Sequence, residues 1–126
     1  MQTISWQLSD RRAEIDVFET GRSLVMHILT DVTFENSARI RTAVLFAWEA
    51  RERLGTVILD MGGVHHIDSS GVGVLLELAQ KAARANIPFV LCGLEASPRR
   101  VLDRTGLSEL FRISNEPSGC ANRPGV

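Results

Sequence analysis

Residues 57–83, VILDMGGVHHIDSSGVGVLLELAQKAA, decide the fold of this chain. The apolar run at residues 57–59 predicts a buried strand that ends at Asp60. After a loop through Ile-Asp-Ser-Ser-Gly at residues 67–71, apolar residues recur at steps of three and four, which predicts a helix with one apolar face. That face is predicted to consist of Val72, Leu75, Leu76, Ala79, Ala82 and Ala83.

Two hydroxyl groups, those of Ser69 and Ser70, lie at the start of this helix. The first backbone N–H groups of a helix lack intrahelical acceptors, and the helix dipole places positive charge there. Such a place can hold a phosphate group with little rearrangement. Ser is also a favoured N-cap residue, so a purely structural role for one of the two serines stays open.

The rest of the chain alternates strands and helices around this stretch, which predicts one α/β domain with a mostly parallel, mixed sheet. We expect four to five strands and about four helices. The other elements are expected at residues 13–20 and 24–29 (a hairpin), 35–53 (a helix ended by Gly55), 89–92 (a strand), 97–106 (a helix capped by Ser97), 107–111 (a helical turn) and 112–114 (a strand). Residues 1–12 are predicted to be a loose segment or edge strand, residues 13–114 the domain, and residues 115–126 a disordered tail.

Composition favours a globular domain in the cytoplasm. The chain of 126 residues has a net charge of −1, so no basic field favours nucleic acid. No apolar run approaches the roughly 20 residues that span a bilayer, and no signal peptide is visible, so direct membrane insertion is not expected. The two cysteines, Cys92 and Cys120, are predicted to be free thiols in a reducing compartment, with Cys92 buried.

Several short motifs make this sequence resemble the STAS domain. They are Leu59-Asp60, Gly63-Val64, Ile67-Asp68-Ser69-Ser70-Gly71, Gly73-Val74-Leu75-Leu76, Gly93-Leu94, Val101-Leu102 and Thr105-Gly106-Leu107, and the resemblance runs over roughly residues 13–111. The family includes bacterial anti-sigma factor antagonists and the cytoplasmic tails of sulfate-permease-type transporters.

The resemblance implies a protein–protein switch. In similar antagonists, an anti-sigma factor that is also a serine kinase phosphorylates the serine after the aspartate, which corresponds to Ser69, with Ser70 as the second choice. The implied partner-binding surface consists of Asp31, Asp60, Asp68, Ser69, Ser70 and Gly71. Antagonists usually carry Gly-x-Leu-Asp at the strand end before the first long helix, and this chain has Thr30-Asp31-Val32-Thr33 there. A homodimer stays open.

Two other functions stay open, a STAS module of an anion transporter or sensory complex, and a small-ligand or nucleotide binder at the helix end near Asp68 and Ser70. No catalytic residue is predicted, because Asp60 and Asp68 lack a third group, and Asp60 is expected to bond loop N–H groups. No metal or other cofactor is predicted, since the adjacent His65 and His66 point to opposite sides of an extended chain.

Overall fold

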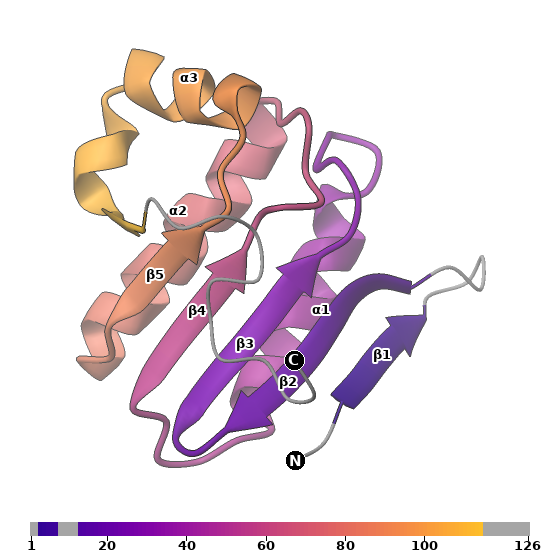
Figure 1. Ribbon diagram of the computed structural model, residues 1–126, viewed down its shortest axis with the longest axis vertical. Coiled ribbons are helices and arrows are strands. Elements are labelled where there is room, and N and C mark those ends of the chain that lie inside the picture. Colours follow the sequence, from indigo (N-terminus) through magenta and orange to yellow (C-terminus); the bar gives the residue numbers. More distant parts are fainter. Residues whose placement is uncertain (1–2, 8–12, 115–126) are drawn as a thin grey trace.

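The domain is built on one mixed β-sheet. The computed structural model describes residues 3–7 and 13–114, and α1 and α2 lie together on one face of the sheet (Figure 1). The predicted tail at residues 115–126 lies outside this range, as do parts of the predicted N-terminal segment. Residues 3–7 of that segment form a strand at the edge of the sheet.

The strands follow one another across the sheet in the order of the chain, β1-β2-β3-β4-β5-β6. Within the described ranges they are β1 Thr3–Gln7, β2 Ala13–Thr20, β3 Ser23–Ile28, β4 Thr56–Asp60, β5 Phe89–Cys92 and β6 Arg112–Ile113. β1, β2 and β3 pair antiparallel, and β3, β4, β5 and β6 pair parallel. The mixed α/β fold is therefore confirmed. The sheet has 6 strands rather than four to five, because β1 adds to β2 and the short β6 adds to β5.

Three α-helices and one 3-10 helix are present in residues 13–114: α1 Ser37–Glu49, α2 Ser69–Ala85, α3 Ala96–Arg104 and η1 Leu107–Leu110. Side chains from α1 and α2 pack on β2, β3, β4 and β5 to form the main core. α3 lies at the end of the sheet at which β4 and β5 finish (Figure 1).

The first helix is shorter than predicted. α1 ends at Glu49, and Arg53 rather than Gly55 adopts the left-handed backbone conformation, with φ 59°. The reason is a tertiary contact, because Arg22 donates from Nε to the carbonyl oxygen of Arg53 at 3.0 Å and accepts from the backbone N–H of Gly55 at 2.7 Å. The predicted Ser97 cap of the third helix is also wrong, since the N-cap of α3 is Glu95.

The buried face of α2 is rotated relative to the prediction. Val74 and Leu78 are buried with Leu75, whereas Leu76 is half-buried and Ala83 is exposed. The fully buried set on this helix is Gly71, Val72, Val74, Leu75, Leu78 and Ala82. Leu78, with 1% of its surface exposed, is the deepest of the large side chains on α2.

Cys92 corrects a second prediction. It is fully buried at the end of β5, as expected, but it is disulfide-bonded rather than a free thiol. The only other cysteine of the sequence, Cys120, lies outside the described residues. Neither cysteine belongs to a local motif, so the sequence spacing could not reveal a covalent bond.

Leu78→Ala should lower the free energy of unfolding by about 2–5 kcal/mol, because it empties a fully buried position. Leu76→Ala, two residues earlier on the exposed side of the same helix, should cost clearly less. Urea denaturation followed by circular dichroism measures both. An equal loss for the two variants would mean that the buried face of α2 is wrongly assigned.

Candidate partner-binding site

Two loops meet at the carboxyl end of the sheet, one after β3 and one after β4. A parallel bridge joins Val32 in the first loop to Ile67 in the second. The backbone N–H of Val32 donates to the carbonyl oxygen of His66, and that of Asp68 donates to the carbonyl oxygen of Val32, each at 3.3 Å. The bridge places the start of α2 beside the approach to α1.

A carboxylate from each loop holds the other loop. Asp31 Oδ1 accepts the backbone N–H groups of His65 and His66 at 2.7 and 3.1 Å. In return, Asp68 Oδ2 accepts the backbone N–H of Phe34 at 2.8 Å. These reciprocal bonds, each between residues more than thirty positions apart, make the two loops one structural unit.

Asp68 is also the N-cap of α2. Its Oδ1 accepts the backbone N–H groups of Ser70 at 2.9 Å and Gly71 at 3.1 Å. The hydrogen bond from Phe34, followed by those from Gly71 and Ser70, lowers the pKa of the Asp68 carboxyl below its ordinary value of 3.8. Asp68 is therefore a carboxylate at neutral pH. The cap is this aspartate and neither serine.

Glycines allow the close approach of the loops. A Cβ on Gly71 would lie 2.7 Å from the carbonyl oxygen of Val32 and 3.2 Å from the Cβ of Ile67. A Cβ on Gly63 would lie 2.6 Å from the carbonyl oxygen of Ile28. Gly71 is itself buried, so it supports the site rather than offering a partner contact as the sequence suggested.

Asp60 does not belong to the exposed surface. It is 1% exposed, and its Oδ1 accepts the backbone N–H of Gly62 at 2.9 Å. The expected bond to a loop N–H group is present. The expected role of Asp60 in partner contact is contradicted by its burial, because a buried carboxylate cannot touch a partner.

The two serines differ in accessibility. Ser69 is exposed and Ser70 is partly buried, although both lie in the first turn of α2. The N–H groups of Ser70 and Gly71 already donate to Asp68. A phosphate group at the helix start would therefore compete with the Asp68 carboxylate for these two N–H groups.

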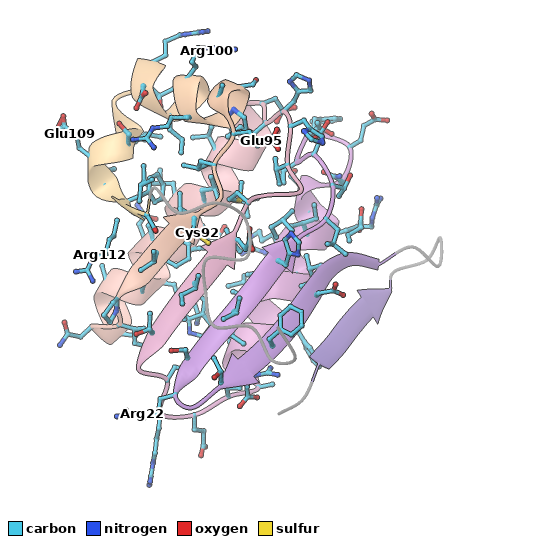
Figure 2. The ribbon with its side chains drawn as sticks, viewed as in Figure 1. Arg22, Cys92, Glu95, Arg100, Glu109 and Arg112 are labelled. Atoms are coloured by element: carbon cyan, nitrogen blue, oxygen red, sulfur yellow. The ribbon has the colours of Figure 1, made fainter. Side chains whose placement is uncertain are left out.

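Two features of this surface were missed in the sequence. Phe34 is 80% exposed directly beside Asp68, although large apolar residues are usually at least half-buried. His65 Nδ1 lies 2.7 Å from Oε1 of Glu95, which is labelled in Figure 2 and precedes α3. This contact raises the pKa of the His65 imidazole above its ordinary value of 6.5. The ring of His66 faces the hydroxyl of Ser97 at 3.3 Å rather than Asp68.

Of the predicted site residues, the structure thus brings Asp31, Asp68, Ser69 and Ser70 together on one loop pair. The surface combines an accessible hydroxyl, fixed negative charge and an exposed aromatic ring.

Comparison with known proteins identifies the family. The family model of the STAS domain matches residues 14–118, so this chain belongs to the STAS domain family. A curated relative from Bordetella bronchiseptica, BtrV, is named as an anti-sigma factor antagonist and is 31% identical over 65 residues. The match covers 52% of this chain and 56% of BtrV, so it spans little more than half of that relative.

Solved structures show the same fold at low sequence identity. The phosphorylated form of SpoIIAA from Bacillus has a TM-score of 0.60 at 19% identity, covering 81% of this chain and 92% of SpoIIAA. The mouse anion transporter Slc26a9 has a TM-score of 0.70 at 19% identity, covering 92% of this chain and 20% of the transporter. Within residues 3–7 and 13–114, no helix has the length and apolar character needed to cross a bilayer.

Gly71→Ala should destabilise the domain by about 1–3 kcal/mol, because the new methyl group overlaps the backbone of the neighbouring loop. Gly73→Ala is the matched control, since a Cβ there meets nothing within 4 Å. It should stabilise the exposed helix position by about 0.5–1 kcal/mol. Thermal and urea denaturation of the two variants tests the close contact of the loops. If both substitutions changed the free energy of unfolding in the same direction, the close contact of the loops would be contradicted.

The lowered pKa of Asp68 predicts a pH-dependent effect of Asp68→Asn. A depressed carboxyl pKa contributes stability above the unfolded-state pKa, and this contribution is lost as the pH falls through the folded-state value, here below 3.8. The stability difference between wild type and Asp68→Asn should therefore shrink between about pH 5 and pH 2. Urea denaturation across this range measures it. A difference that does not change with pH would exclude the proposed hydrogen bonds to the charged form.

Proposed function

We propose that this chain is an anti-sigma factor antagonist that binds an anti-sigma factor with serine kinase activity and is switched by phosphorylation of Ser69. The observation that carries the proposal is the exposed Ser69 hydroxyl, directly after the charged Asp68, on a loop pair held by reciprocal carboxylate bonds. The likeness to BtrV, by name an antagonist, supports this role over that of a transporter module. SpoIIAA, which shares the fold, is known in a phosphorylated form.

The unphosphorylated surface suits a protein partner. Phe34 offers an aromatic contact in a loop whose backbone is fixed by Asp68, so little conformational freedom is lost on binding. Aromatic side chains are common among the residues that dominate interface energies. We expect Phe34 and Ser69 to lie in the same contact.

Phosphorylation would add about −1.5 to −2 charges beside the Asp68 carboxylate. Because Asp68 already accepts the N–H groups of Ser70 and Gly71, the phosphate is left largely unneutralised at the surface. Moving a partner from 99% to 1% bound takes roughly 5.5 kcal/mol of differential affinity. Repulsion from a partner's carboxylates and the lost contact of a packed hydroxyl act in the same direction.

This role requires no reaction catalysed by the chain itself. We propose that it acts by binding alone, as the substrate of the partner's kinase activity.

Ser69→Asp should weaken binding to the anti-sigma factor strongly, whereas Ser69→Ala should bind like wild type and resist phosphorylation. Phe34→Ala should weaken binding without preventing phosphorylation of the folded chain. The measurement uses each purified anti-sigma kinase encoded in the same genome, with isothermal titration for binding and mass spectrometry for the modified residue.

Ser70→Ala is the matched control, because it removes the neighbouring and less accessible hydroxyl. It should leave phosphorylation at Ser69 intact. Modification of Ser70 alone, or a Ser69→Asp variant that binds as tightly as wild type, would reject the switch.

A further inference from the structure

A second surface, distant from Ser69, has the form of a docking groove. The second half of α2, the start of β5 and the end of η1 enclose two adjoining hollows of ≈ 200 and ≈ 250 Å³. The apolar lining includes the small side chains of Ala79 and Ala83 together with Ile87, Phe89 and Leu110, of which Leu110 is 60% exposed. Such an exposed apolar hollow is suited to one large apolar side chain of a partner.

One basic side chain borders this groove. Arg112 is the charged residue that lines both hollows, and its side chain projects outward from the edge of the sheet in Figure 2. We call this surface, made by Ala79, Ala83, Ile87, Leu110 and Arg112, the basic groove. Its chemistry fits an apolar side chain flanked by carboxylates.

The same chain carries an apolar side chain close to carboxylates at the opposite end of its sheet. Phe34 is 80% exposed, Asp68 accepts its backbone N–H, Glu35 follows it in the chain and Asp31 stands three residues before it. These residues form what we call the acidic knob. The backbone of the knob is fixed, because Asp68 accepts the N–H of Phe34 at 2.8 Å.

The knob and the groove lie at opposite ends of the sheet. The knob follows the carboxyl end of β3, whereas the groove adjoins the amino end of β5, and β3, β4 and β5 are parallel. The acidic knob of one chain therefore cannot reach the groove of the same chain. We propose that the acidic knob of one copy docks into the basic groove of a second copy, so that the protein self-associates head to tail.

The proposal goes beyond the proposed function and does not depend on it. In a head-to-tail contact two different surfaces meet, so each assembly keeps one free knob and one free groove. Unless the copies close into a ring, further copies can add, and the assemblies become larger as the protein concentration rises. Because the contact pairs carboxylates with Arg112, salt should weaken it. Phe34 belongs to both surfaces, so a docked copy would compete with an anti-sigma factor, whereas the groove is not part of the Ser69 site.

The test is analytical ultracentrifugation of the full chain over a range of concentrations at low and high salt. Wild type should show a weight-average mass that rises above 13.9 kDa and past two chains with concentration, and less so in high salt. Phe34→Ala removes the knob, and Ala83→Glu blocks and recharges the groove at an exposed helix position. Each variant alone should remain at the mass of one chain.

Two further samples make the test specific. Ala85→Glu introduces the same charge on the same helix at an exposed position outside the groove, and it should associate like wild type. A mixture of Phe34→Ala and Ala83→Glu contains one intact groove and one intact knob, so it should form a complex of two chains and no larger species. Circular dichroism confirms that the variants are folded.

A wild type that stays at one chain at all concentrations, or that stops at two chains, would overturn the head-to-tail contact. So would association that Ala83→Glu leaves unchanged, or a mixture of the two variants that forms no complex. The Ala83→Glu variant changes only the groove, which is not part of the Ser69 site, and Ser69→Asp is read by binding of the anti-sigma factor, so the two proposals can fail separately.

Discussion

The exchange of carboxylate hydrogen bonds between two loops is the constraint on which the site depends. Asp31 holds the backbone of the loop before α2, and Asp68 holds the backbone of the loop before α1. Each carboxylate accepts N–H groups that would otherwise lack acceptors at the end of the sheet, where strand pairing stops. These polar bonds add to the burial of Val32, Val64 and Ile67 from the two loops, and Ser69 and Phe34 take fixed positions relative to one another.

This constraint limits the residues that the site tolerates. The loops are close enough that Gly71 has no room for a Cβ against Val32, while Gly73, two residues further along α2, faces open space. The close packing of the loops also divides the residues of the predicted partner-binding surface into an inner and an outer group. Asp60 and Gly71 lie inside and shape the loops, and Ser69 and Phe34 lie outside where a partner can touch them.

The sequence predicted the α/β class, the order of elements and the position of Ser69 at the start of α2, because the strand, loop and helix patterns are local. It placed the α2 face wrongly, since the run of small residues through Ala79, Ala82 and Ala83 fits two overlapping apolar stripes. The bond between Asp68 and Phe34 joins residues 34 positions apart, and no periodicity encodes such a contact. The disulfide of Cys92 was missed for the same reason.

The strand order has a consequence for synthesis on the ribosome. Because each strand pairs with the one made just before it, the sheet can grow from its N-terminal edge as the chain emerges. The antiparallel hairpin of β2 and β3 needs only local contacts and can form early. The loops around Ser69 close when β4 and α2 have emerged, whereas the basic groove needs β6, the final strand. A nascent chain therefore completes the loop pair around Ser69 before the groove beside β6.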